Sequence, residues 1–241
     1  MRKKIAVYIF LALGIGIITF NLIDFKEYEL TEYDKELISY FEEVVLNTEY
    51  DDNPKKVLKW TEKMNLFIIK DENLDSQVSI IKNTIDKINN LIKDDFKIQL
   101  VDKPSEMNSV IFLLDKEKTK ILVPSFFDGI DEDFIGLADV EYDTETFEIK
   151  VVKIFIDINE PIELQEATIL EEITQSIGIM NDSETYPNSI FYKNKHLDTI
   201  RKTDYSKLDK DIIRMLYNPK MKPGLNFEQA EKVIKEILED K

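Results

Sequence analysis

The chain has 241 residues, of which 43% are hydrophobic and 10% aromatic, so it can form a packed core and is not a wholly disordered protein. Its formal net charge of -16 repels nucleic-acid phosphates, and no basic patch interleaved with aromatic residues is present, so nucleic acid is excluded as an expected partner. The absence of cysteine excludes disulfides, a lipid-modified cysteine, thiolate metal sites and a cysteine nucleophile.

The N-terminal segment predicts a membrane anchor. Three basic residues at positions 2–4 precede an apolar run over residues 5–23, and acidic residues follow it. At 1.5 Å per residue this run spans roughly 28 Å, close to the thickness of the hydrocarbon core of a bilayer. By the positive-inside rule, residues 1–27 are therefore expected to form a cytoplasmic stub and a signal-anchor helix, with the rest of the chain outside the cytoplasm. A cleaved signal peptide is the alternative, although its apolar region is usually shorter and residues 19–23 form a poor cleavage site.

The rest of the chain alternates between helix and strand patterns. Residues 28–56 are expected to hold an amphipathic helix over 30–46 and a linker broken by an Asn-Pro pair. The main domain is expected over residues 57–219, with a strand-like run at 57–69, helices at 76–92, 162–177 and 206–217, and strands at 96–101, 109–114, 134–142 and 148–156. Residues 220–241 end in a helix, for which Asn226 and Gln229 form a capping box.

One segment, residues 170–181, has the spacing of the zinc-protease motif H-E-x-x-H-x-x-G-x-x-H. In that motif two histidines one helical turn apart bind zinc, the glutamate polarises a water molecule, and the glycine ends the helix before the third histidine. On this spacing Glu172 stands at the general-base position and Gly178 at the turn. The three histidine positions are occupied by Glu171, Gln175 and Asn181.

A second match follows in the order found in metzincins. Residues 188–192, Asn-Ser-Ile-Phe-Tyr, are similar to the turn S-[IV]-M-Y, with Ser189 and Tyr192 matching and Phe191 at the methionine position. The last helix of matrixins reads L-S-x-x-D-x-x-x-I-x-x-L-Y, and its spacing is matched by Ser206, Asp209, Ile213, Leu216 and Tyr217. Residues 60–217 therefore resemble a degenerate metzincin.

This resemblance implies an α+β fold of the zincin type. A twisted mixed sheet packs on two long helices, and the second helix carries the site. Residues 136–139, Gly-Leu-Ala-Asp, resemble the edge strand that faces the substrate in metzincins. The sequence also looks like an uncharacterised bacterial family of secreted or anchored proteins of unknown function, through the Glu-Glu-Ile-Thr-Gln run, Tyr217-Asn218-Pro219 and Lys222-Pro223-Gly224. That family typically lacks the metal histidines too, so it implies no activity.

The residues at the ligand positions do not predict a zinc site, and no metal or other cofactor is expected. Zinc prefers imidazole or thiolate, and the carboxamides of Gln175 and Asn181 are poor substitutes. Calcium could use the oxygens of Glu171, Glu172, Asn181 and Asp182, but their spacing is not that of a calcium-binding loop. The favoured interpretation is a hydrogen-bonded polar cluster of Glu171, Gln175 and Asn181 that replaces the metal.

Three functions follow from these observations. The leading one is a single-pass protein of the cell membrane whose extracytoplasmic pseudo-metalloprotease domain binds a peptide, a protein or another envelope component without cleaving it. The second is an active hydrolase that uses Glu172 with a non-zinc metal or with no metal. The third is a purely structural envelope protein.

The apolar run at residues 5–23 should remain on the mature protein and hold it in the membrane, because it is long enough to span the bilayer and no good cleavage site follows it. Membrane fractionation should recover the full-length chain with the membrane, and protease added outside the membrane should degrade residues 28–241. A shortened, freely soluble protein outside the cell would contradict this topology.

Overall fold

The computed structural model describes residues 28–47, 54–129, 134–193 and 201–240. The anchor expected at residues 5–23 lies outside these ranges. Within them, no helix has both the length and the apolar character needed to cross a bilayer. Residues Glu32–Lys241 form one compact unit. The four-part division expected from the sequence stays a prediction.

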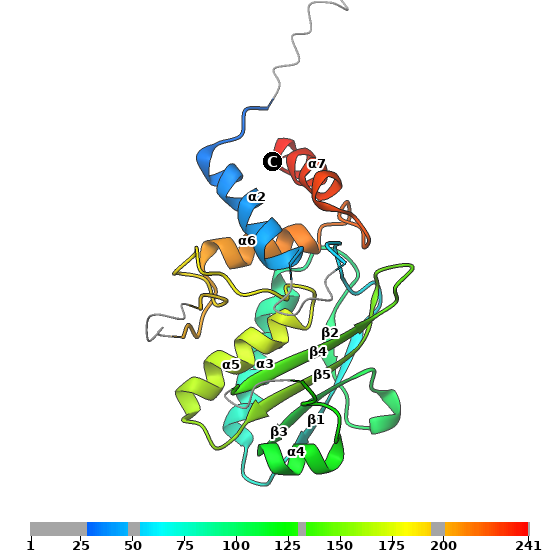
Figure 1. Ribbon diagram of the computed structural model, residues 1–241, viewed down its shortest axis with the longest axis vertical. Coiled ribbons are helices and arrows are strands. Elements are labelled where there is room, and N and C mark those ends of the chain that lie inside the picture. The colour runs from blue at the N-terminus through cyan, green and yellow to red at the C-terminus, as the bar shows by residue number, and fades with distance from the viewer. Residues whose placement is uncertain (1–27, 48–53, 130–133, 194–200, 241) are drawn as a thin grey trace, which may run out of the picture. The chain divides into compact units, whose positions relative to one another are not determined.

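A five-stranded mixed sheet forms the centre of this unit (Figure 1). Its strand order is β2-β1-β3-β5-β4, and every neighbouring pair is parallel except β4 with β5. The strands are β1 (Met64–Lys70), β2 (Ile98–Leu100), β3 (Ser109–Leu114), β4 (Gly136–Tyr142) and β5 (Ile149–Asp157). The predicted α+β class is confirmed. The run expected over residues 57–69 is a strand only in its second half.

Two long helices, α3 (Asp75–Leu91) and α5 (Ile162–Gln175), lie against each other on one face of the sheet (Figure 1). On α3 the apolar residues recur at helical spacing, and Ile81, Ile85 and Ile88 are buried. On α5 nearly every residue after the first turn is buried, and α5 contacts both β4 and β5. The helix with the protease-like spacing therefore packs on the sheet, as the resemblance implies.

A short helix that the sequence does not predict follows β3 and contacts it. Helix α4 (Lys116–Leu122) begins at Asp115, whose side chain accepts a hydrogen bond from the Lys118 backbone N–H. Helix α4 has no apolar stripe. Its apolar residues, Ile121 and Leu122, are neighbours at its C-terminal end, and both are exposed. Apolar side chains between the sheet and this region form a cluster, namely Val110, Phe112, Leu114, Phe126, Leu137 and Phe155. A short 3-10 helix, η1 (Pro104–Glu106), was also not expected.

Three helices gather at the end of the unit away from α4 (Figure 1). They are α2 (Glu32–Val45), α6 (Lys207–Leu216) and α7 (Phe227–Glu239), and α2 contacts both of the others. The capping box predicted for Asn226 and Gln229 is confirmed at the start of α7. A second capping box begins α6, between Ser206 and Asp209.

The end of α5 is fixed by Gly178, as its place in the motif predicts. Its φ angle is +103°, which L-amino acids rarely adopt, and its N–H donates to the carbonyl of Gln175 over 2.9 Å. A Cβ at this position would lie 2.1 Å from the backbone oxygen of Leu58. Two independent constraints, conformation and space, therefore require glycine here.

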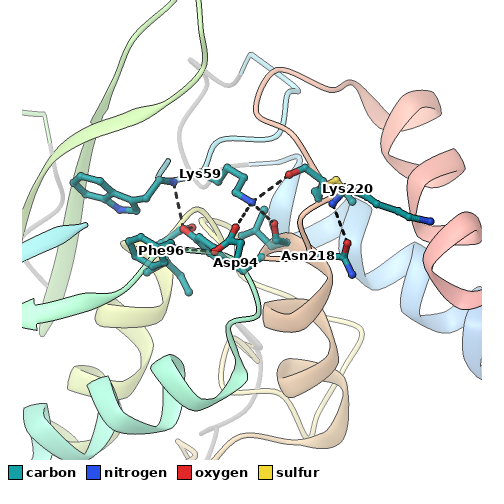
Figure 2. A network of polar contacts seen from close by, with 10 residues as sticks. Lys59, Asp94, Phe96, Asn218 and Lys220 are labelled. Atoms are coloured by element: carbon teal, nitrogen blue, oxygen red, sulfur yellow. Dashed lines mark hydrogen bonds and ion pairs between the residues drawn. The ribbon is translucent and has the colours of Figure 1, made fainter. Parts of the chain in front are cut away.

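A buried polar network ties this end of α5 to the end of α6. The Tyr217 hydroxyl donates to the carbonyl of Ile177 over 2.9 Å and accepts from the Trp60 backbone N–H over 3.3 Å. Beside it, the Lys59 ammonium donates to Asp94 over 2.9 Å and to the carbonyl of Leu216 over 3.0 Å (Figure 2). Burial lowers the pKa of Lys59 and raises the pKa of Tyr217 well above its usual value.

Replacement of Gly178 by alanine should destabilise the fold strongly, because the new methyl group collides with the Leu58 carbonyl. Gly129 is the matched control, since it also has a positive φ, +79°, but a Cβ there meets nothing within 4 Å. In urea-induced unfolding we expect a loss of about 1 kcal/mol for Gly129→Ala. Gly178→Ala should lose more than about 3 kcal/mol. Equal losses would show that the close approach to Leu58 is not a constraint.

Candidate functional site

The side chains of α5 at the protease-like positions are buried. Their exposed fractions are 3% for Glu171, 5% for Glu172 and 8% for Gln175. Two adjacent carboxyl groups in an apolar helix are costly to bury unless cations or hydrogen-bond donors compensate them. The partners of these carboxyl groups therefore define what the site can do.

Glu171 is compensated by two cations that the sequence analysis missed. Arg201 Nη1 lies 3.1 Å from one carboxylate oxygen of Glu171, and Lys193 Nζ lies 3.3 Å from the other. Lys193 also forms an ion pair with Asp182, and Arg201 Nη1 donates to the Thr168 hydroxyl over 3.4 Å. At the position of the first zinc ligand, a carboxylate is thus held between an ammonium and a guanidinium group.

A short backbone bridge brings Lys193 to this position. The Ser183 N–H donates to the carbonyl of Phe191 over 2.9 Å, and the Lys193 N–H donates to the carbonyl of Ser183 over 3.0 Å. Ser183 and Tyr192 therefore pair like residues of parallel strands, and the Lys193 side chain forms its ion pair with Asp182 next to this bridge. No short-range pattern in the sequence signals this pairing, because nine residues without a helix or strand separate Ser183 from Lys193.

Glu172 faces the start of the edge strand β4. A Cβ added to Gly136 would lie 2.7 Å from a carboxylate oxygen of Glu172 and 2.3 Å from the Thr168 methyl group. The strand and the helix consequently approach each other closely at this point, and only glycine fits. Residues 136–139, which resemble the edge strand of metzincins, and the residue at the general-base position are neighbours in space.

Asn181, at the third ligand position, is directed elsewhere. Its side-chain amide donates to the carbonyl of Glu43 over 2.9 Å, and its backbone N–H donates to the carbonyl of Val44 over 3.2 Å. These carbonyls belong to the last turn of α2, which has no partner for them within its own helix. Among the described residues, no hydrogen bond joins Asn181 to Glu171 or Gln175, so the structure does not contain the three-residue polar cluster expected from the sequence.

The turn and the last helix are joined through the buried carboxylate of Asp209. It accepts hydrogen bonds from the Ser189 hydroxyl over 2.9 Å, the Ile190 N–H over 3.2 Å and the Ser206 N–H over 2.8 Å. The Tyr40 hydroxyl of α2 also donates to it, over 2.6 Å. Burial and the charge of Asp209 raise the pKa of Tyr40 well above its usual value.

The segments that match the metzincin turn and last helix therefore meet in space. Phe191, at the methionine position, is fully buried, and Tyr192 contributes the backbone bridge to Ser183. The matched residues Asp209 and Tyr217 hold the two ends of α6, the first through the turn and the second through the end of α5. These residues hold the site in position, and they do not form its surface.

The donor set does not fit the zinc that metzincins with the intact motif bind. Both oxygens of Glu171 are paired with cations, and the Asn181 amide is bound to α2. Within the described ranges, no three His, Cys, Asp or Glu side chains are grouped so that they could hold a metal ion. Zinc would have to displace two positive charges to reach Glu171 and would gain carboxamide ligands that it binds poorly.

Comparisons with known proteins supply a family without a known function and a weak structural similarity. The family described as "Protein of unknown function (DUF2927)" matches residues 34–236. No curated protein matches the chain. Among solved structures, "Crystal structure of myroilysin" is similar with 10% sequence identity and a TM-score of 0.41, over 80% of this chain and 98% of that one. A TM-score of this size does not assign the fold.

The loss of Arg201 should destabilise the protein more than the loss of its partner. In Arg201→Gln the buried Glu171 carboxylate keeps only Lys193, and we expect a loss of about 1–3 kcal/mol in the free energy of unfolding. Glu171→Gln should be milder, because Arg201 is 30% exposed and water can solvate it. Addition of Glu171→Gln to Arg201→Gln should restore part of the lost stability.

The control for this prediction is Arg214→Gln, which removes a guanidinium that lies 2.8 Å from Asp211 at the surface. Such exposed pairs contribute little, so a change within about 0.5 kcal/mol is expected. Urea-induced unfolding measures all four variants. If Arg201→Gln were no more destabilising than Arg214→Gln, Arg201 would not compensate a buried charge.

Proposed function

The chain belongs to the DUF2927 family, whose members are described as proteins of unknown function, and we propose that it binds an extended peptide without cleaving it. In this proposal the protein is a pseudo-metalloprotease, held in the cell membrane by residues 5–23, with its degenerate metzincin-like domain outside the cytoplasm. The observation that carries the proposal is the edge strand β4 beside α5, where the carboxylate at the first ligand position is already paired with two cations.

The free edge of β4 supports peptide binding. In the described sheet β4 pairs only with β5, and this pairing is antiparallel. The Asp157 N–H donates to the carbonyl of Ile135, so the carbonyl of Ile135 is directed toward β5. In an antiparallel pair, residues whose backbone groups are directed toward the neighbouring strand alternate with residues whose backbone groups are directed away from it. The backbone N–H and C=O groups of Gly136, Ala138 and Val140 are then directed to the outer side, where an added strand can pair with them.

The ion pairs of Glu171 support the absence of cleavage. In a metalloprotease the metal supplies the positive charge that activates water and stabilises the developing oxyanion. Here Arg201 and Lys193 supply positive charge at that place, but neither can lower the pKa of a bound water molecule as zinc does. The positions of the three ligand residues therefore favour binding over hydrolysis.

The arrangement of elements supports the metzincin-like part of the proposal. A mixed sheet lies on two long helices, and the second of them, α5, carries Glu172 and ends at Gly178. The turn at Ser189 rests on Asp209 of α6. These are the features that the sequence resemblance implies for a zincin.

A hydrolase that uses Glu172 is the second candidate, because its carboxylate lies beside Gly136 at the start of the edge strand. In this case the peptide along β4 would be a substrate. Cleavage of casein by the wild-type protein, abolished by Glu172→Gln, would favour this candidate over the pseudoenzyme.

Peptide binding can be tested with a displayed library of random twelve-residue peptides and the variant Ala138→Pro. Proline removes the outward N–H of β4 and leaves the pairing with β5 intact, because Ala138 does not donate to β5. The selected peptides should bind this variant at least about 10-fold more weakly, the effect of a lost hydrogen bond and a steric clash.

The matched control is Ala138→Ser, which keeps the N–H at the same position and should change the dissociation constants less than about 2-fold. Selection of no peptide at all would overturn the proposed function. Peptides that bind Ala138→Pro as well as the wild type would show that the binding surface is not the edge of β4.

A further inference from the structure

We propose that the peptide bound along β4 carries a lysine or arginine that lies opposite Asp139 and Glu141. This inference rests on the proposed function and adds the chemistry of the ligand. It concerns the face of β4 that is turned away from α5, and it uses none of the residues at the protease-like positions.

The two acidic residues lie on one face of the edge strand. Gly136 is directed toward α5, since a Cβ there would contact Thr168 and Glu172. Side chains alternate along a strand, so Leu137, Asp139 and Glu141 share the other face. Leu137 belongs to the apolar cluster on that face. The side chains of Asp139 and Glu141 are 43% and 55% exposed and are thus accessible to a ligand.

These two carboxylates share one cation. Lys153 of β5 is paired across the strand with Asp139, and its ammonium lies 3.3 Å from the Asp139 carboxylate and in contact with that of Glu141. Partial burial by itself lowers the pKa of Lys153, but the hydrogen bond to Glu141 and the charge of Asp139 outweigh it, and the pKa is raised. Among the described residues, these two negative charges share one positive charge, so this face of β4 carries a net negative charge.

A strand added to the outer side of β4 would supply the missing charge. Its side chains on this face would have Cβ atoms about 4.5–5.5 Å from those of Asp139 and Glu141, a distance at which opposite charges attract. Lys153 belongs to β5, which lies on one side of β4. A lysine or arginine of the added strand would approach the same carboxylates from the opposite side. Each acidic side chain would then lie between two cations.

The same charges disfavour a second copy of the chain as the occupant. Two β4 strands paired edge to edge would bring Asp139 and Glu141 of one copy against those of the other. The net charge of -16 on each chain adds a long-range repulsion. A basic peptide meets neither obstacle, and the overall charge of the protein attracts it.

The test uses the full-length chain in detergent and the displayed twelve-residue library. We expect the selected peptides to contain lysine or arginine at every second position of one stretch. Binding of synthetic peptides from this selection should weaken about 3- to 10-fold in the double variant Asp139→Asn, Glu141→Gln, the effect of one or two cross-strand charge pairs. Replacement of these lysines or arginines by glutamine should weaken binding to the wild type equally and leave binding to the double variant unchanged.

The control double variant is Glu228→Gln, Glu236→Gln on α7, which changes the net charge by the same amount at exposed positions on another element. It should bind the peptides as the wild type does. If the peptides bind along β4, as judged by Ala138→Pro, but show no basic preference, this inference is wrong and the proposed function stands. An equal loss in both double variants would assign the preference to the net charge and overturn the inference, and selection of no peptide would overturn both proposals.

Discussion

The structure depends on the compensation of a buried negative charge in the middle of α5. Glu171 is 3% exposed, and a carboxylate in such a place requires a cation or several hydrogen-bond donors. Arg201 and Lys193 provide this charge from two sides. A divalent metal bound at this position would also compensate the charge of Glu171. The metal and the two cations therefore exclude each other. The ion pairs thus explain how the Glu171 carboxylate can be buried at a position where zinc proteases have a metal ligand.

The remaining contacts keep these cations in place. Lys193 is positioned by the backbone bridge between Ser183 and Tyr192, and the preceding turn is held by Asp209. The end of α5 is fixed by Gly178, where the chain passes so close to Leu58 that no side chain fits. The charged site is therefore held by these contacts on the side of α5. In the part of the chain that the structure describes, β4 pairs with β5 alone, so its outer edge carries no strand.

The sequence predicts the elements well and the site only partly. The strands, α3, α5 and the capping box of α7 follow from periodicity and local hydrogen bonding, which are properties of neighbouring residues. Helix α4 escapes this reasoning, because it is short and has no apolar stripe. The pairs of Glu171 with Arg201 and Lys193 join residues 30 and 22 positions apart, so only the folded chain brings them together. Asn181 fits the motif by spacing, but the unpaired carbonyls at the end of α2 bind it instead.

The central claim is that cations take the place of the catalytic metal, and zinc content tests it most directly. The purified full-length chain is dialysed first against zinc and then against metal-free buffer, and the bound metal is measured by elemental analysis. We expect no stoichiometric zinc, because Glu171 is already paired and the other ligand positions hold carboxamides. One equivalent of zinc per chain, lost in Glu171→Gln, would contradict it.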